Sequence, residues 1–371
     1  MIRFPRSLAF VALLAGCADG SPLEPSDRPA VTVLNWNLYL GADVDAVIRA
    51  AATPDTSDDI PALVAEIVTL SETDFPARAE AIADAIAATR PEVVGLQEVV
   101  NIDIDLTGIG LPIVVHLDFL AILQAALAAR GQDYAVAAIV TNTTAAPLPG
   151  ILLVDHDALL VDPARVTVTS TIAATYANNR GVVAPGVALL RGFVGITGTI
   201  DGRSYAIFNT HLEPDQGGLD LSGLRAAQAA ELVAATGGAS PTILMGDFND
   251  VAGSATHRVV EGAGFRDVWA ELHPGAAGLT CCHVEDLSNP SATFDTRIDY
   301  VFARGMEHPI TGVQGRVELL GEEPADRVSG PAHALWPSDH AGLVADLLVP
   351  PGFRTSAASS TPGRSRPPGR R

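Results

Sequence analysis

The chain contains no lysine. Its 23 basic residues are all arginine and stand against 43 acidic residues, which gives a formal net charge of −20 at pH 7. The absence of lysine excludes a Walker-type phosphate loop, a Schiff-base mechanism and a serine–lysine dyad, because each of them needs a lysine amine. A chain this acidic also repels the phosphate backbone of nucleic acids unless metal ions intervene.

Aromatic and cysteine residues are scarce as well. Aromatic residues make up 5% of the chain, and we find no basic patch with interleaved aromatic side chains of the kind that binds single-stranded nucleic acid. Two of the 3 cysteines, Cys281 and Cys282, are adjacent. A disulfide between them would close a strained small ring, and the sequence predicts no scaffold of disulfides. The adjacency also disfavours a zinc site that would combine this pair with His273 and His283.

The N-terminus has a short apolar run after two arginines. Leu8–Ala15 is too short to cross a bilayer as a mature helix. The run ends in Leu-Ala-Gly-Cys at Cys17, which resembles the lipobox of bacterial lipoproteins, where the cysteine is lipidated and becomes the new N-terminus. We therefore expect residues 1–17 to be a lipoprotein signal and residues 18–30 a flexible tether. Cys17 would anchor an exported protein to a membrane, at the periplasmic face or the cell surface. The alternative is an ordinary secretory signal with a chance cysteine.

The C-terminus has the opposite charge to the rest of the chain. Residues 351–371 hold five arginines, no acidic residue and little that is apolar, so we predict a basic disordered tail. Such a tail either solubilises the protein or touches an anionic lipid or polymer. Residues 31–350 contain no linker, which predicts one domain, and we expect a monomer.

Strand-like and helix-like segments alternate within this domain, as judged by periodicity and by turn residues. The predicted strands or β-rich segments are Val31–Asn37, Val93–Glu98, Tyr134–Thr141, Ala158–Thr169, Val187–Ile200, Arg203–Leu212, Thr242–Gly246, Arg297–Ala303, Thr311–Leu319 and Gly342–Val349. The predicted helices are Thr73–Arg90, Leu117–Arg130, Leu221–Thr236 and Ala255–Gly262. Several strands are apolar on both faces, which favours two mixed sheets packed together, with helices outside, over one open parallel sheet.

Polar side chains gather at the ends of six predicted strands. They are Asn37, Glu98, the pair Asn209 and His211, the pair Asp247 and Asn249, the pair Arg297 and Asp299, and the pair Asp339 and His340. Positions i and i+2 of a strand point to the same side, so the three pairs with that spacing are each predicted to face one cleft. Carboxylates suit a hard ion such as Mg²⁺, and amides and imidazoles stabilise a phosphate as charge shifts onto its oxygens.

The ordered motifs WN, LQE, NTHL, GDFN, RIDY and SDH resemble those of the endonuclease/exonuclease/phosphatase superfamily, in particular its deoxyribonuclease-like and sphingomyelinase-like branches. The resemblance covers residues 31–349. It implies an α/β fold, a four-layer α/β sandwich with two central mixed β-sheets flanked by helices. It also implies hydrolysis of a phosphate ester through in-line attack of water, with Mg²⁺ or Mn²⁺ as the cofactor.

The same resemblance implies which residues hold the metal and the substrate. Glu98 would be the main metal ligand, and Asp339 would assist the metal site. Asn37 would contact the phosphate or steady the metal carboxylate. Asn209, the partner of the histidine in NTHL, is a further candidate for substrate binding.

The remaining motif residues would carry out the chemistry. Asp247 would align and deprotonate the attacking water, and Asn249 would hold the phosphate in the transition state. His340 would bind or protonate the phosphate, oriented by Asp299. His211 would be the acid for the leaving oxygen, since a histidine can serve this role near neutral pH. The plain alternative for Asp299 is an ion pair with its neighbour Arg297.

Three other signals are weaker. Asn101–Pro112 has acids at alternating positions, but it lacks the glycine and the final glutamate of a calcium loop, so an extended loop or edge strand is favoured. The stretch LTCCHVEDLSNP around Cys281 resembles one in bacterial members of the superfamily and would shape the cleft wall. Arg180 and Arg191 precede the NTHL strand; we take Arg191 as a phosphate clamp, although a surface ion pair is the commoner fate of an arginine.

The motifs define the chemistry better than the substrate. A membrane tether and an acidic body favour a phosphodiesterase that acts on lipid headgroups. The alternatives are an extracytoplasmic nuclease on DNA or RNA, a phosphomonoesterase on sugar or inositol phosphates, and a non-catalytic surface lipoprotein that binds a partner.

Overall fold

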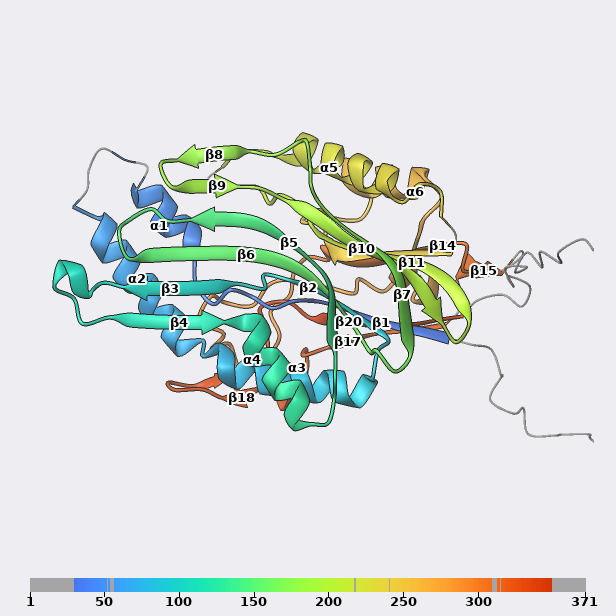
Figure 1. Ribbon diagram of the computed structural model, residues 1–371, viewed down its shortest axis with the longest axis horizontal. Helices are drawn as coiled ribbons and strands as arrows, with labels where there is room; N and C mark the ends of the chain where they lie inside the picture. Colours follow the sequence, from blue (N-terminus) through green and yellow to red (C-terminus); the bar gives the residue numbers. More distant parts are fainter. Residues whose placement is uncertain are drawn as a thin grey trace, which may run out of the picture.

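The computed structural model describes residues 30–51, 53, 57–216, 218–239, 241–308, 312–313 and 315–348. The predicted signal, nearly all of the tether and the tail lie outside these residues, so their assignments stay predictions. At the centre of the molecule two β-sheets pack face to face, and helices cover the outer faces (Figure 1). In the described part of the chain, no helix has the length and apolar character that crossing a membrane requires.

The larger sheet is mixed. Its strands are β1 (Ala30–Asn37), β2 (Val93–Gln97), β3 (Asn101–Asp105), β4 (Val114–Asp118), β5 (Ala135–Ala145), β6 (Ile151–Val161), β8 (Gly181–Ala184), β9 (Val187–Leu189), β17 (Gly315–Leu320) and β20 (Gly342–Leu348). Eight of them follow the order β17-β20-β1-β2-β6-β5-β9-β8, and β3 and β4 join beside β6. β1 and β2 are parallel, whereas β1 and β20 are antiparallel.

The smaller sheet is mixed in the same way. Its strands are β7 (Val166–Thr175), β10 (Gly192–Ile200), β11 (Arg203–His211), β12 (Thr242–Asp247), β13 (Arg266–Asp267) and β14 (Asp299–Arg304). The order is β13-β14-β12-β11-β10-β7, with β11 and β12 parallel. The hairpin of β10 and β11 closes at Asp201 and Gly202, the turn that the sequence predicts.

Four layers follow from where the apolar side chains point. Residues such as Val33 and Ile243 fill the core between the sheets. Leu34, the next residue along β1, points the other way into a second core. Apolar residues therefore occupy both faces of β1, which explains its nearly continuous apolar sequence.

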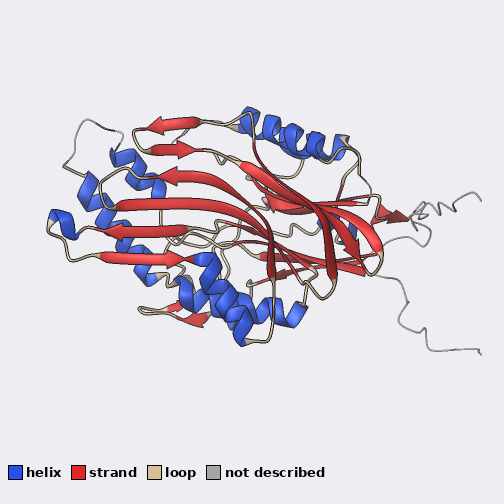
Figure 2. Cartoon of the chain, viewed as in Figure 1, coloured by secondary structure: helices blue, strands red, loops and turns tan. Residues whose placement is uncertain are grey.

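The helices complete the sandwich. Against the larger sheet lie α1 (Val44–Ala51), α2 (Asp59–Glu72), α3 (Phe75–Thr89) and α4 (Phe119–Ala129). Against the smaller sheet lie α5 (Ser222–Ala235) and α6 (Ala255–Gly262). Figure 2 shows the helices on the outside and the strands between them. The predicted fold class is confirmed.

Short elements occupy the edges and loops. They are α7 (Val268–Leu272), η1 (Thr107–Ile109), η2 (Pro324–Asp326), the pair β15 (Glu307–His308) and β16 (Gly312–Val313), and the pair β18 (Val328–Ser329) and β19 (Ala334–Leu335). Asn101–Pro112 forms β3 and η1, as the strand alternative predicts. Asp103 pairs with His116, and Asp105 accepts hydrogen bonds from Thr107, so these acids do not converge as in a calcium loop.

Most predicted elements are confirmed to within a few residues, and the differences have local causes. Ala158–Thr169 and Val187–Ile200 each span parts of two strands; a turn in which Arg165 N–H donates to Asp162 O at 3.1 Å separates the first pair. The helix expected from Leu117 begins at Phe119, because Asp118 caps it by accepting from Ala121 N–H at 3.0 Å. Helix α2 was not predicted, although its buried residues have helical spacing.

Candidate active site

Strand register brings the polar residues of the smaller sheet together. His211 lies opposite Asp247 where β11 pairs with β12, and Asp247 lies opposite Asp299 where β12 pairs with β14. In the larger sheet Asn37 pairs with Gln97, the residue before Glu98. The two sheets therefore present their polar strand ends at one shared edge.

Asn37 joins the two sheets at this edge. Its side-chain Nδ2 donates to Glu98 Oε1 at 3.0 Å and to Asp247 Oδ2 at 3.2 Å, and its Oδ1 accepts from Tyr39 N–H at 2.9 Å. Glu98 uses its second oxygen, Oε2, to accept from Leu40 N–H at 2.7 Å. Asn37 is fully buried, so it fixes the distance between the two carboxylates.

Asp247 lies between two imidazoles. Its Oδ1 accepts from Asn249 N–H at 2.8 Å, and its Oδ2 lies 3.6 Å from His211 Nε2 and 3.9 Å from His340 Nε2. Burial and then the nearby Asp299 raise the pKa of Asp247 to about 7. The pKa of Asp247 thus lies near neutral pH.

The two imidazoles have opposite electrostatic surroundings. Burial opposes a charge on His340, but Asp299, Asp339 and Asp247 outweigh it and hold the pKa of His340 well above the usual value. Its Nδ1 lies 2.8 Å from Asp299 Oδ2. Burial, followed by the charge of Arg191, holds the pKa of His211 well below the usual value. These directions favour His340 over His211 as the group that gives a proton.

Both ring nitrogens of His211 face donor groups. Its Nδ1 lies 3.0 Å from Arg191 Nη1, and a guanidinium can only donate. Its Nε2 lies 2.9 Å from Asn249 Nδ2, which also donates to Leu212 O at 2.9 Å. A neutral imidazole accepts at one nitrogen only, so these contacts fix the position of the ring but not its tautomer.

The carboxylates fit a divalent cation. Burial, followed by the charge of Glu98, raises the pKa of Asp339 to about 6, although His340 opposes the shift. Asp247, Asp299 and His340 place ligand atoms within 4.8 Å of one another. Asn37 Nδ2 bonds both Glu98 and Asp247, and the charge of Glu98 acts on Asp339, so these three carboxyl groups lie in the same part of the site. Carboxylate oxygens are the ligands that Mg²⁺ and Mn²⁺ prefer.

Two residues predicted to face the cleft, Asn209 and Arg297, have other partners. Asn209 is fully buried between the sheets; it donates to Leu96 O and Ala158 O and accepts from Gln97 Nε2. The prediction that it binds substrate therefore does not fit its position. Arg297 pairs with Asp267 at 2.8 Å rather than with Asp299, so this i, i+2 pair does not face one cleft.

Arg191 is in the site but is not a surface ion pair. It is half-buried, lying 3.6 Å from Glu213 and 3.8 Å from Asp155 as well as touching His211. Arg180 lies 4.0 Å from the same Glu213. Both guanidiniums are thus held by acids beside the catalytic histidine, where the sequence showed only two isolated arginines.

Sequence reasoning missed Arg78 and Ser338. Arg78 is fully buried and donates to the carbonyl oxygens of Thr73, Leu38, Tyr39 and Pro337, the last three beside motif residues. Ser338 Oγ donates to Asn37 O at 2.6 Å and accepts from His340 N–H at 3.1 Å. One signal was present for Arg78, a charged residue on the apolar face of a helix.

An apolar pocket adjoins the polar cleft. The cleft, with an empty volume of about 530 Å³, is lined by residues that include Glu98, Arg191 and His211. The pocket, with an empty volume of about 550 Å³, is lined from α1, α2, β3, β5 and β6, and Glu66 is its one charged wall residue. Leu40, Val44 and Leu153 line both spaces. A ligand whose phosphate lies in the cleft can therefore extend an apolar group into the pocket.

The fold and the site together define a metal-dependent hydrolase of phosphate esters. The model of the Endonuclease/Exonuclease/phosphatase family matches residues 34–340, and the chain belongs to that family. The predicted family and enzyme class are thereby confirmed. No curated protein shows significant similarity to the chain.

Solved structures share the fold at low sequence identity. An endonuclease/exonuclease/phosphatase from Beutenbergia cavernae DSM 12333 has a TM-score of 0.57 and 20% identity, covering 87% of this chain and 72% of that chain. A mannosyl-6-phosphatase from Bacteroides thetaiotaomicron VPI-5482 has a TM-score of 0.53 and 17% identity, covering 86% of this chain and 99% of that chain. D. rerio TDP2 complexed with a single-strand DNA product has a TM-score of 0.50 and 17% identity, covering 86% of this chain and 98% of that chain.

Proposed function

We propose that the protein is a phosphodiesterase that hydrolyses lipid headgroups at a membrane surface. The observation that carries the proposal is the apolar pocket beside the catalytic cleft. A phospholipid or sphingolipid joins a phosphodiester to apolar chains, and this pocket and cleft offer a place for each part within one continuous wall. A sugar phosphate has no apolar group that would use the pocket.

Charge supports the same substrate class. The cleft wall contains Glu98, Asp155 and Glu213 against one arginine, Arg191, and the whole chain has a net charge of −20. A long polyanion such as DNA would meet repulsion along its whole length, whereas a lipid brings one phosphate to the site. Because the fold resembles that of TDP2 complexed with a single-strand DNA product, single-stranded DNA is the alternative substrate to test.

We assign the catalytic roles from the geometry. Asp247 accepts the proton of the attacking water, because its pKa of about 7 suits a base near neutral pH. His340 stays charged and stabilises the phosphate as negative charge develops. His211 lies beside Asp247 and is held by Arg191 and Asn249. Asn249 and Asn37 position the phosphate and the carboxylates.

Mg²⁺ or Mn²⁺ would be held by Glu98 and Asp339. When bound, the ion polarises the phosphate and offsets its charge. Arg191 orients His211 through Nδ1, and this contact assigns it a positioning role beside its predicted contact with substrate.

We further propose that Cys17 carries lipid and holds the exported protein on a membrane. The lipobox-like run and the polar residues that follow it support this proposal. A tether on the same membrane as the substrate raises the effective substrate concentration at the site.

The test compares substrates on the full-length chain. Mg²⁺-dependent hydrolysis is measured on sphingomyelin vesicles, phosphatidylinositol vesicles, single-stranded and supercoiled DNA, and a soluble phosphomonoester. We expect lipid cleavage, reduced at least 100-fold in Asp247→Ala. DNA cleavage without lipid cleavage, lost in the same variant, would show a nuclease instead.

A matched pair of variants tests the pocket. Val44, half-buried at the start of α1, borders both spaces. Val44→Glu places a charge at the border and should lower lipid hydrolysis about 10-fold while leaving the hydrolysis of bis(4-nitrophenyl) phosphate unchanged. Val44→Leu should leave both rates unchanged. Equal rates of lipid hydrolysis for the two variants would show that the pocket does not bind the lipid.

A further inference from the structure

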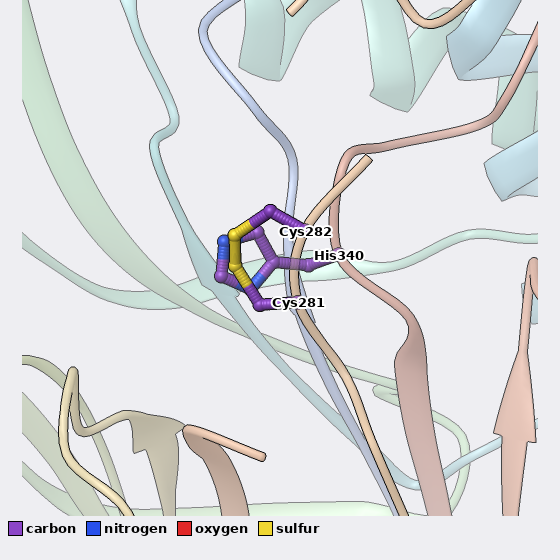
Figure 3. A group of neighbouring side chains, drawn as sticks. All are labelled: Cys281, Cys282 and His340. Atoms are coloured by element: carbon purple, nitrogen blue, oxygen red, sulfur yellow. A yellow bond between two sulfur atoms is a disulfide. The ribbon is translucent and has the colours of Figure 1, made fainter. Parts of the chain in front are cut away.

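Cys281 and Cys282 lie directly against the catalytic His340. Their sulfur atoms and a ring nitrogen of His340 are within 4.8 Å of one another, and a disulfide joins the two sulfurs. Figure 3 shows the bonded sulfurs alongside the imidazole ring. The cleft-wall role expected for this stretch of sequence therefore has a specific contact, which is the imidazole ring that is paired with Asp299.

The segment that carries the cysteines joins the two strand ends of the site. On one side Ala341 N–H donates to Thr280 O at 2.8 Å and His283 N–H donates to Asp339 O at 3.0 Å. On the other side Thr280 Oγ1 accepts from the N–H groups of Ile298 and Asp299 at 3.2 Å each. The disulfide is thus anchored to the backbone of both members of the His340–Asp299 pair.

The polar contacts of the His340 ring lie at its edge. Asp299 bonds its Nδ1 at 2.8 Å, while Asp247 and Asp339 each lie 3.9 Å from its Nε2. His340 is 5% exposed, so packing also holds the ring. The two sulfurs, within 4.8 Å of a ring nitrogen, are part of that packing, and a change in their position changes the support of the ring.

The two sulfurs differ in access. Cys281 is only 2% exposed, whereas Cys282 is exposed. A small thiol can therefore reach the Cys282 sulfur, and Cys281 is the leaving thiolate inside the wall.

We propose that the Cys281–Cys282 disulfide is a redox-controlled positioning element for His340. Two unbonded thiols cannot lie as close together as two bonded sulfurs, so reduction turns Cys282 outward and frees the ring. The oxidised chain is then the active form and the dithiol form the slow one. An oxidising compartment favours the active form. The inference rests on phosphate-ester hydrolysis at this site and not on the choice of a lipid substrate.

The reducing agent is a dithiol. One of its thiolates attacks Cys282 Sγ, the disulfide breaks, and Cys281 leaves as a thiolate that takes up a proton. The second thiol of the reductant then displaces Cys282, which is protonated in turn. The reductant leaves as a cyclic disulfide, and two electrons and two protons have passed to the cysteine pair.

The experiment uses the full-length chain with Cys17→Ser, so that only the pair contributes thiols. Turnover of bis(4-nitrophenyl) phosphate with Mg²⁺ is measured before and after dithiothreitol, with the thiols counted by titration. We expect kcat to fall about 10-fold with KM nearly unchanged, and to recover when the chain is reoxidised with oxidised glutathione. The matched control Cys281→Ser/Cys282→Ser should have the low rate throughout and ignore the reductant.

A second readout needs no substrate. Reduction should shift the ring ¹⁵N resonances of His340, assigned through their loss in His340→Gln, whereas those of His257, remote from the pair, should stay. Unchanged kcat after two thiols have formed would overturn the proposal. If the disulfide resists reduction, a parental rate of turnover in Cys281→Ser/Cys282→Ser would overturn the proposal. If this double variant does not fold, the single variant Cys282→Ser replaces it, and a parental rate in that variant would overturn the proposal.

Discussion

Asp155 is a carboxyl group buried beside the active site with one positive neighbour. It is 6% exposed, and one of its oxygens lies 3.8 Å from Arg191 Nη1. Burial raises the pKa of Asp155 to about 7, because the attraction of Arg191 only partly offsets the lost solvation. Asp155 is therefore protonated in the folded chain at a pH where it would be ionised in the unfolded chain.

The pKa of Asp155 predicts a pH dependence with a definite sign. Between about pH 4 and pH 7 the folded state holds a proton that the unfolded state releases, so this group lowers the free energy of unfolding as pH rises from about 4 to about 7 and adds no further change above that. Asp155→Asn removes this dependence. We expect the free energy of unfolding of the variant, relative to the parent, to rise by about 2–3 kcal/mol from pH 5 to pH 8.

Urea unfolding at four pH values in that range, without metal, measures the difference. Asp201→Asn, at an exposed hairpin turn, is the control and should give a flat difference. A flat difference for Asp155→Asn as well would show that Asp155 is ionised at pH 5 in the folded chain.

Side-chain direction was the main limit on predicting single residues. Asn209 and His211 share a side of β11 by spacing, yet Asn209 lies deeper and bonds interior groups while His211 reaches the edge. The i, i+2 rule gives the face of a strand but not the distance from its end. Arg191 lines the cleft, and its contact with His211 depends on the packing of β10 against β11.

At the scale of elements, helix α3 holds two active-site loops in place. Its Arg78 donates to Leu38 O at 2.6 Å, Tyr39 O at 2.9 Å and Pro337 O at 3.0 Å. These carbonyls belong to the loops after Asn37 and before Asp339. Burial lowers the pKa of Arg78 to about 10, which still leaves it charged near neutral pH.

We expect Arg78→Met to lower the free energy of unfolding by about 3–5 kcal/mol, because it leaves several buried carbonyl oxygens without a donor. Catalysis should fall as well, since the loops with Asn37 and Asp339 lose a common anchor. Thermal melting measures the loss of stability, and Mg²⁺-dependent turnover of bis(4-nitrophenyl) phosphate measures the loss of catalysis.

The matched control is Arg49→Met on helix α1. Arg49 pairs with Asp43 at 3.0 Å on the surface, and its loss should cost less than about 1 kcal/mol. Similar melting temperatures for the two variants would contradict the role assigned to Arg78.

At the scale of the whole molecule, the four layers leave one edge where both sheets end. The motifs on β1 and β2 come from one sheet, and those on β11, β12 and β14 come from the other. Only the packing of the two sheets brings Asn37 within hydrogen-bonding distance of Asp247. The apolar pocket opens next to this edge, between helices α1 and α2 and the larger sheet.

The proposed anchor belongs to this scale too. We expect Cys17→Ala to move the protein from the membrane fraction to the soluble fraction of cells that express the full chain, because a lipidated cysteine supplies the membrane affinity. Immunoblotting of the two fractions measures the shift, with Cys282→Ala as the control that stays on the membrane. An unchanged distribution in Cys17→Ala would contradict lipid anchoring at this residue.

The sequence by itself determined the class of fold, the family and a set of candidate site residues. Periodicity is a local property, and the motifs are short runs in a fixed order, so both can be read along the chain. Asn37, Glu98, Asp247, Asp299 and His340 were named from their motifs and meet at one edge in the structure.

Only the tertiary structure decided how those residues are charged and supported. The pKa values of His211 and His340 shift in opposite directions because of burial and of neighbours from other strands, and no local pattern contains that information. Arg78, the apolar pocket and the contact of Cys281 and Cys282 with His340 likewise join segments far apart in the chain. Long-range packing sets these features, and the sequence specifies them only through the completed fold.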